Sequence, residues 1–389
     1  IGLCHQRLSI IDLSTQGSQP MGSRSGRYSI VYNGEIYNYL ELKEKYGLDW
    51  LRSDTDTEVV LELIERLGVE EACREFNGMW AMIVYDRKEN KLLLSRDRFG
   101  KKPLYYMVHK DTAYVASELK TFLSIEEFEW EVNALSAARF LSQSLQDVDE
   151  QSWIEGILSL PAGCNGEIDL ADPAKGVQNI HPYWILEALD DKSKQSEDGF
   201  IEELHAVVSD AIAIRLRSDV PVGIALSGGL DSSIIAAVTS QLNGSSGNQT
   251  KLFCATNPGA EEDESHFATA VARHLGHDLD SFSLDANPNE NLLELLQLCN
   301  FHNDAPVSSF SGVLFYKLMN SARDLGITVI LTGQGADEAY CGYRKYPILE
   351  AKRLLQSGSP IQATKLMAGF VKQGTILSQF KFSEAKRYM

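Results

Sequence analysis

The chain has 389 residues, of which 44% are apolar, and it carries a formal net charge of −18 from 36 basic and 54 acidic side chains. Its length predicts about two domains, and its apolar content is ordinary for a globular protein. The acidic balance argues against nucleic acid or a membrane surface as a partner, because both require clustered Lys and Arg. No apolar run approaches the ~18 residues that a membrane-spanning helix needs.

The cysteines indicate reduced thiols rather than disulfides or a zinc site. They stand apart, with no C-x-x-C pair, at residues 4, 73, 164, 254, 299 and 341. We therefore expect a cytoplasmic protein. Because Ile1 lies in the middle of what reads as a folded segment, we also expect the chain to be a fragment of a longer protein.

The first 170 residues predict an α+β domain. Short strand-like runs predict strands over 28–32, 79–85, 91–95, 104–107 and 112–116, and two helices are expected over 38–45 and 57–67. Asn33-Gly34 follows the first of these strands, and this dipeptide is the strongest short-range signal for a hairpin turn. Hairpins mixed with helices are typical of α+β domains.

The polar stretch 189–199 has no periodicity and predicts a linker, after which the pattern changes. Strands and helices now alternate. We expect strands over 222–226, 251–256, 281–284 and 327–331, and helices over 232–241, 263–275, 290–299 and 313–325. This alternation predicts an α/β domain with a parallel sheet.

A glycine pair at the end of the first of these strands predicts an anion site. Ser227, Gly228 and Gly229 follow the apolar run, and a helix begins near Ser232. Backbone N–H groups and a helix N-terminus together favour phosphate, and Asp231 adds an oxygen ligand for phosphate-bound Mg²⁺. No Gly-Lys-Ser/Thr follows, so this is not a Walker loop. An ordinary glycine turn is the alternative.

A second glycine loop, over residues 332–338, repeats this order: a buried strand, two glycines, and then Asp337 and Glu338. Ligands of parallel sheets bind at the carboxyl ends of the strands. The two loops together can therefore cradle a triphosphate and its Mg²⁺. The alternative is two loops that merely end strands, with both carboxylates in solvent.

These motifs resemble a known family. The first loop resembles that of N-type ATP pyrophosphatases. With the second loop and Gly342-Tyr343, it resembles the synthetase domain of glutamine-hydrolysing asparagine synthetases. The N-terminal half is similar to the class II glutamine amidotransferase domain of the same family. The segments that carry this similarity are 5–12, 32–38, 53–58, 96–106 and 116–120.

The resemblance covers nearly the whole chain and implies a fold for each part. For residues 1–170 it implies an Ntn-hydrolase-type αββα sandwich, without its N-terminal portion. Residues 171–199 would be the linker. Residues 200–389 would form an α/β domain with a parallel sheet, like the adenine nucleotide alpha hydrolases, without its C-terminal portion.

The resemblance also implies a reaction. Members hydrolyse glutamine through a cysteine thioester and adenylate the side-chain carboxylate of aspartate with ATP, releasing pyrophosphate. Ammonia then displaces AMP to give asparagine. The implied cofactors are ATP and Mg²⁺, the implied partners are the small-molecule substrates, and a homodimer is left open.

For the glutamine site, the resemblance assigns Arg7 to the glutamine carboxylate and Asp56 to its α-ammonium. The Asn33 side chain and the Gly34 N–H would form the oxyanion hole. Glu35 would add polar contacts, and the pocket would be lined by Leu8, Ser9, Ile10 and Ile11. Taken singly, Asn33-Gly34 reads as a hairpin turn, and Arg7 or Asp56 as a surface charge.

For the ATP site, the resemblance assigns the phosphates to Ser227, Gly228, Gly229 and Ser232. Asp231 and Asp337 would hold Mg²⁺. The positions that surround adenosine in the family are matched here by Leu226, Ala255, Thr332 and Gly333. Taken singly, Ala255 reads as a core residue.

Three departures limit the match. The family's nucleophile is an amino-terminal cysteine, and Cys4 does not match it, because the family carries an apolar residue there. We therefore assign no nucleophile and expect this chain alone not to hydrolyse glutamine. The family also uses a lysine after the second loop, but the candidates match no motif: Lys365, Lys372, Lys381 and Lys386.

The third departure is Gln334, which stands where asparagine synthetases typically carry glutamate near the acyl-adenylate. Glutamine can orient that intermediate by hydrogen bonding but cannot accept a proton as a carboxylate does. The acceptor is therefore left open between aspartate and another carboxylate, of a sugar acid or a peptide. A non-catalytic relative is a further alternative.

Overall fold

The structure is a computed structural model that describes residues 1–187, 196–243, 250–256, 263–283, 291–343 and 345–372. The chain divides into two compact units. The first comprises residues 1–223 and 282–329, and the second comprises 224–281 and 330–389. Among the described residues, no helix is long and apolar enough to cross a membrane.

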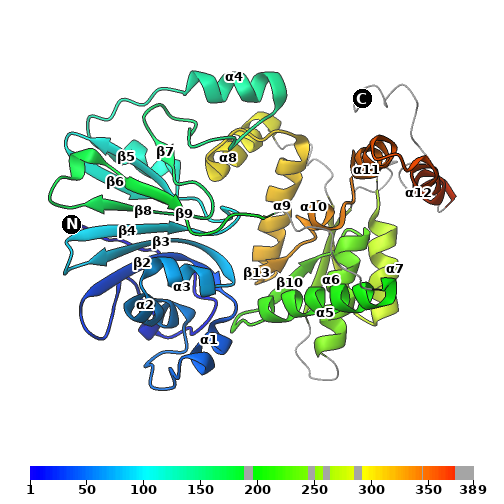
Figure 1. Cartoon of the computed structure of the whole chain (residues 1–389), viewed down its shortest axis with the longest axis horizontal. Helices are drawn as coiled ribbons and strands as arrows, with labels where there is room; N and C mark the ends of the chain where they lie inside the picture. Colours follow the sequence, from blue (N-terminus) through cyan, green and yellow to red (C-terminus); the bar gives the residue numbers. More distant parts are fainter. Residues whose placement is uncertain (188–195, 244–249, 257–262, 284–290, 344, 373–389) are drawn as a thin grey trace. The chain divides into compact units, whose positions relative to one another are not determined.

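The first unit is built on two antiparallel sheets (Figure 1). The larger sheet has the order β1-β2-β3-β4-β8-β9, made of β1 (Met21–Gly22), β2 (Tyr28–Ile36), β3 (Gly78–Asp86), β4 (Lys91–Arg96), β8 (Cys164–Asp169) and β9 (Gln178–Pro182). The smaller sheet has the order β6-β5-β7, made of β6 (Thr112–Ala116), β5 (Tyr105–His109) and β7 (Leu158–Ser159).

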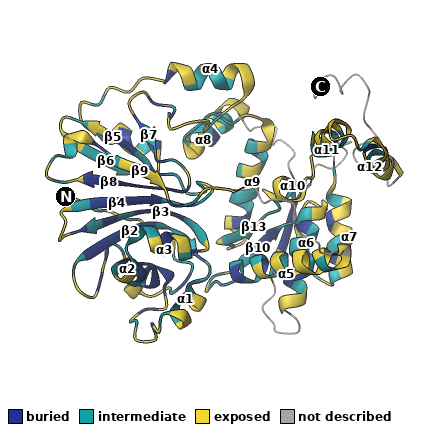
Figure 2. Cartoon of the chain, viewed as in Figure 1, coloured by how far each residue is buried: buried dark blue, intermediate teal, exposed yellow. Residues whose placement is uncertain are grey.

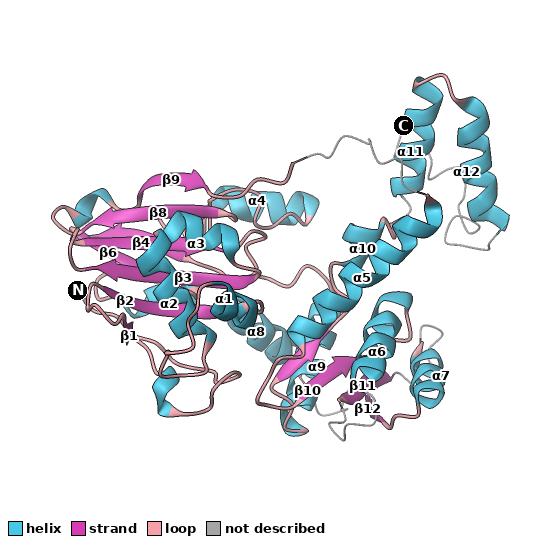
Figure 3. Cartoon of the chain, turned by 60° about the horizontal axis from the view of Figure 1, so that its bottom comes forward, coloured by secondary structure: helices cyan, strands magenta, loops and turns pink. Residues whose placement is uncertain are grey.

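Helices cover the larger sheet on one face, as Figure 3 shows. They are α1 (Tyr39–Lys45), α2 (Asp56–Leu67) and α3 (Val69–Glu75). The apolar face of α2 packs with Ile30 and Trp80 into one core. A second core, with Leu94 and Tyr106, fills the space between the two sheets, and residues of this region are dark blue in Figure 2.

The outer side of the smaller sheet is covered as well. There, Phe122 of the short helix η2 (Leu119–Ser124) packs against Met107 of β5. The layers are therefore helix, sheet, sheet and helix, and the predicted αββα sandwich is confirmed. The remaining helices of this unit are η1 (Thr15–Gly17), α4 (Ala134–Gln143), η3 (Pro173–Lys175), α5 (Glu197–Arg215), α8 (Leu292–Asn303) and α9 (Phe310–Asp324).

The hairpin turn predicted at Asn33-Gly34 is wrong. Strand β2 continues through both residues to Ile36, and Gly34 pairs with Trp80 of β3 in register. A Cβ at Gly34 would collide with the Met79 carbonyl and lie 2.8 Å from the Trp80 Cα. Glycine serves here for close strand approach rather than for a turn.

The stretch expected to be a linker contains regular structure at both of its ends. Strand β9 pairs with β8, and Tyr183 is buried in the first core, so the larger sheet extends past residue 170. Helix α5 begins at Glu197, where the Ser196 hydroxyl accepts a hydrogen bond from the Gly199 N–H. Residues 188–195 of that stretch lie outside the described residues.

A four-stranded sheet has the order β12-β11-β10-β13, and its strands are parallel, as predicted. They are β10 (Val222–Ala225), β11 (Lys251–Thr256), β12 (Leu279–Ser283) and β13 (Val329–Leu331). The helices of the second unit are α6 (Leu230–Asn243), α7 (Ser265–Leu275), α10 (Ala336–Tyr340), α11 (Lys345–Gln356) and α12 (Pro360–Lys372).

The strand order changes direction at β10. The chain runs from β10 to β11 and β12 on one side and later adds β13 on the other side. Parallel sheets bind ligands at the carboxyl ends of strands where the order reverses. The loops that follow β10 and β13 are the two glycine loops singled out in the sequence.

Candidate functional sites

The residues expected to form the oxyanion hole lie at the end of β2. Asn33, Gly34 and Glu35 are all half-buried. Within the described part of the chain, the Asn33 side-chain amide makes no hydrogen bond, so its N–H donors are free to meet a ligand. Preorganised donors of this kind stabilise negative charge that develops on a carbonyl oxygen.

Two carboxylates lie close together here, those of Glu35 on β2 and of Asp56 at the start of α2. Asp56 opens α2 and is only 4% exposed. One of its oxygens accepts hydrogen bonds from the Tyr32 hydroxyl at 2.9 Å and the Ile36 N–H at 2.8 Å. Burial raises the pKa of Asp56. Asp56 is therefore held by internal donors rather than left open at the surface.

Glu35 has the most informative electrostatics in this region. Burial raises its pKa to about 8, and the nearby Asp56 adds to that effect, while Lys102 and Arg7 oppose it. Two acids that repel each other in a half-buried position create a negative potential. Such a potential favours a cationic group, for example the α-ammonium of an amino acid.

Arg7 lies close enough to Glu35 to lower its pKa, but its guanidinium is bound to its own loop. It donates to the carbonyls of Ile11, Asp12 and Ser14 at 3.0, 2.5 and 2.8 Å. Within the described residues Arg7 forms no ion pair. Its charge is thus not neutralised by a carboxylate, which leaves it able to bind an anion.

The predicted lining residues 8–11 differ in their exposure. Leu8 is 69% exposed, Ile11 is buried, and Ser9 and Ile10 are half-buried. The structure therefore places Arg7, Asn33, Gly34, Glu35 and Asp56 in one neighbourhood, whereas Leu8 points into solvent.

Sequence reasoning missed Asp97 and Lys102. The buried Asp97 carboxylate accepts four backbone N–H groups, from Trp80, Phe99, Lys101 and Lys102, at 2.9 to 3.2 Å. These bonds fix the turn that brings Lys102 near Glu35. The motif 96–106 carried the family resemblance, but nothing in it revealed that an aspartate organises the turn.

The loop after β10 is closed by its two serines. The Ser227 N–H donates to the Ser232 hydroxyl at 3.2 Å, and the two hydroxyls lie 3.1 Å apart. Gly228 has a φ of +84°, and a Cβ there would lie 2.5 Å from the Ala268 nitrogen. The backbone path therefore requires glycine, as a phosphate loop does.

The two glycine loops touch each other. A Cβ at Gly333 would lie 2.9 Å from the Asp231 Cβ and 3.2 Å from the Ser232 nitrogen. Burial raises the pKa of Asp231, and the charges of Asp337 and Glu338 raise it further. The acids of the second loop therefore lie close enough to Asp231 to act on its carboxyl.

These acids suit a divalent cation. Within the described residues, neither Asp231 nor Asp337 forms an ion pair, whereas Glu338 accepts a hydrogen bond from the Tyr343 hydroxyl at 2.7 Å. No three His, Cys, Asp or Glu side chains of the described chain could hold a metal by themselves. Magnesium commonly takes one or two carboxylates and completes its shell with substrate phosphates and water, and the residues present fit that arrangement.

The positions expected around adenosine differ in their accessibility. Leu226 is only 1% exposed and belongs to the core of the second unit. Ala255, Thr332 and Gly333 are half-buried, and Gln334 is exposed. Of these residues, Leu226 can shape a nucleotide site only through its backbone or as support from below.

The fold defines a class: an αββα sandwich of the amidotransferase type, followed in the chain by an α/β domain with a parallel sheet. Two family models match the chain, a glutamine amidotransferase domain over residues 1–184 and asparagine synthase over 203–388. The chain belongs to the family of glutamine-hydrolysing asparagine synthetases.

Curated relatives agree with this assignment. The "Putative asparagine synthetase 2" (glutamine-hydrolyzing) of Methanocaldococcus jannaschii is 36% identical over 88% of this chain and 67% of its own length. Asparagine synthetase 1 of Bacillus subtilis is 31% identical over 89% of this chain and 52% of its own. The amidase chry2 of Gibberella zeae is 34% identical over 88% and 51%. The chain therefore spans about half the length of the last two relatives.

Solved structures are more distant. Glutamine phosphoribosylpyrophosphate amidotransferase from B. subtilis is 14% identical with a TM-score of 0.34, covering 80% of this chain and 77% of its own. At that similarity it adds nothing to the assignment.

Proposed function

We propose that the protein containing this chain is an ATP-dependent, glutamine-hydrolysing asparagine synthase. It would adenylate the side-chain carboxylate of aspartate and form asparagine with ammonia from glutamine, releasing AMP, pyrophosphate and glutamate. The observation that carries the proposal is the contact of Gly333 with Asp231. It joins two acid-bearing glycine loops at the point where the strand order of the parallel sheet reverses.

In this proposal the loop after β10 holds the ATP phosphates. Ser227, Gly228, Gly229 and Ser232 offer hydroxyls and backbone N–H groups at the start of α6. Asp231 and Asp337 hold Mg²⁺, which when bound neutralises phosphate charge and assists the departure of pyrophosphate. The half-buried Ala255, Thr332 and Gly333 are proposed to surround adenosine, with Leu226 beneath them.

On the glutamine side, the Asn33 amide and the Gly34 N–H are proposed to bind the carbonyl oxygen as it gains negative charge. The negative potential of Glu35 and Asp56 attracts the α-ammonium. Arg7 exchanges some of its loop carbonyls for the glutamine carboxylate, to which a guanidinium binds in bidentate fashion.

A second acceptor is favoured by two observations. Gln334 follows Gly333 in the second loop, and two relatives at 34% and 32% identity are named amidases rather than asparagine synthetases. The alternative proposal keeps ATP and glutamine but transfers the amide to the carboxylate of a sugar acid or a peptide.

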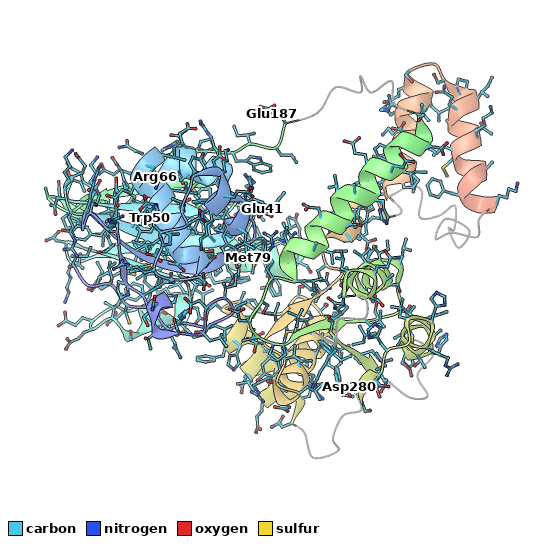
Figure 4. The ribbon with its side chains drawn as sticks, turned by 90° about the horizontal axis from the view of Figure 1, so that it is seen from below. Glu41, Trp50, Arg66, Met79, Glu187 and Asp280 are labelled. Carbon is cyan, nitrogen blue, oxygen red and sulfur yellow. The ribbon has the colours of Figure 1, made fainter. Side chains whose placement is uncertain are left out.

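The test supplies the protein with ATP, Mg²⁺, amide-¹⁵N glutamine and aspartate, and measures labelled asparagine and pyrophosphate. Stoichiometric formation of both supports the proposal. Pyrophosphate formed only with another carboxylate supports the alternative acceptor. No pyrophosphate with any carboxylate contradicts both proposals. Asp231→Asn should abolish pyrophosphate formation, whereas Asp280→Asn, on the outer strand β12, should not (Figure 4).

A further inference from the structure

The short segment 216–221 joins α5 to β10, and its Asp219 is bonded to the loop of residues 10–14, which carries the acceptors of Arg7. It belongs to the part of the chain that matches the asparagine synthase model, whereas the loop it contacts belongs to the amidotransferase match. The contact therefore links residues that are 207 positions apart in sequence.

Asp219 holds that loop through a reciprocal pair of hydrogen bonds. Its N–H donates to the Ile10 carbonyl at 2.9 Å, and its carboxylate accepts the Asp12 N–H at 2.7 Å. Asp12 has a φ of +55°, a conformation that non-glycine residues rarely adopt. A contact that fixes Asp12 there sets the path of the loop on both sides of it.

The same loop carries the acceptors of Arg7. The Arg7 guanidinium donates to the carbonyls of Ile11 and Asp12. Ile11 lies between the two residues that Asp219 bonds, and Asp12 is one of them. The Asp12 carboxylate in turn accepts the N–H of Asp54, two residues before Asp56. Asp219 thus fixes the frame that sets the position of the Arg7 charge relative to Glu35 and Asp56.

Arg217 adds a second attachment. It forms a bidentate ion pair with Glu41 and donates to the Tyr37 carbonyl at 2.7 Å. Glu41, on α1, is labelled in Figure 4. Glu41 and Asp219 are both exposed, so solvent screens the ion pair. We assign the larger effect to Asp219 because it bonds the loop that carries the acceptors of Arg7.

We propose that Asp219 is a positioning residue for glutamine recognition. A carboxylate from the synthase-type part of the chain completes the glutamine site of the amidotransferase-type part, by holding the loop that orients Arg7. This inference rests on the proposed function for the identity of the ligand. It assigns Asp219 an effect on glutamine binding and none on the use of free ammonia.

The experiment compares Asp219→Ala, Asp219→Asn and the control Asp280→Ala in the protein that contains this chain. Asp219→Ala should raise the KM for glutamine about fivefold to tenfold, as expected for the loss of one solvent-exposed hydrogen bond. The kcat with saturating ammonia should stay unchanged. Asp219→Asn should recover most of the loss, because its amide oxygen still accepts the Asp12 N–H.

Hydrogen exchange supplies a readout that does not depend on activity. In Asp219→Ala the amides of residues 10–14 should exchange faster, whereas Asp280→Ala should leave them unchanged. A glutamine KM within twofold of the unaltered protein, with unchanged exchange, would overturn the inference. An equal loss of the ammonia-dependent rate in both Asp219 variants would also overturn it, because the effect would then lie in β10. If the proposed function is wrong, the unaltered protein itself shows no glutamine-dependent amide formation, and this distinguishes that failure from a failure of the inference about Asp219.

Discussion

Glu35 gives the sharpest test of the electrostatics at the candidate glutamine site. Its carboxyl is half-buried beside Asp56, and its pKa is raised from 4.5 to about 8. The folded protein therefore holds a proton on Glu35 over a pH range in which the unfolded chain has released it. Stability from this group is fully present below the unfolded pKa and is lost as the pH rises towards 8. Above that value the loss is complete.

The size of the effect follows from the shift. A change from 4.5 to about 8 corresponds to at most about 5 kcal/mol in the free energy of unfolding. Lys102 lies near Glu35 and stabilises its charged form, and side chains relax around a new charge. We therefore expect about 2–3 kcal/mol between pH 5 and pH 8.5. Glu35→Gln removes this dependence, because an amide does not titrate.

Urea unfolding at half-unit steps from pH 5 to pH 9 measures the difference. All tryptophans of the chain lie within residues 50–184, so tryptophan fluorescence reports the first unit. The unaltered chain should lose stability relative to Glu35→Gln as the pH rises, and the difference should become constant above about pH 8. The control Glu44→Gln, at an exposed position of α1, should follow the unaltered chain at every pH.

Parallel stability curves for Glu35→Gln and the unaltered chain would refute this reasoning. They would mean that Glu35 ionises in the folded protein much as it does in the unfolded chain. Burial and the Asp56 charge would then not disfavour the Glu35 carboxylate, and the raised pKa assigned to Glu35 would be wrong.

Three further predictions concern the backbone and the loops. Gly34→Ala should destabilise the first unit by about 2 kcal/mol or more, because its Cβ would collide with the Met79 carbonyl, and urea unfolding checks this; an unchanged midpoint would contradict it. Asp97→Asn should cost about 2–3 kcal/mol in the same assay, since an amide nitrogen cannot accept the N–H groups that one carboxylate oxygen now accepts; equal stability would show that the turn holds without them. Gly333→Ala should weaken Mg²⁺-ATP binding at least tenfold, because the new Cβ would push Asp231 from its place, and the unfolding of the first unit should change little. Calorimetric titration measures the affinity. An unaltered affinity would show that the second loop is not part of the nucleotide site.

Much of the fold could be predicted from local pattern. Strand β4 is a short apolar run between polar residues, α2 carries its apolar stripe at helical spacing, and β10 runs into a glycine pair, so each was found within a residue or two. The contact between the two loops also followed from sequence, because parallel strands end at the same edge of a sheet.

Other features depend on contacts between distant residues. Asn33-Gly34 favours a turn locally, but pairing along the whole of β3 keeps β2 extended. Helix α5 was missed because a polar stretch precedes it and its start is set by the Ser196 cap. The bonds of Arg7 to its own loop, and the bond of that loop to Asp219, have no local signature in the sequence.

Isotope transfer tests the central claim most directly. The protein is supplied with ATP, Mg²⁺, ammonia and aspartate that carries ¹⁸O in its side-chain carboxylate, and the products are analysed by mass spectrometry. If the two loops bind ATP for attack at its α-phosphate, one ¹⁸O should appear in AMP and none in inorganic phosphate or pyrophosphate. Label in inorganic phosphate, or AMP without label, would contradict adenylation of the carboxylate and with it the role assigned to both loops.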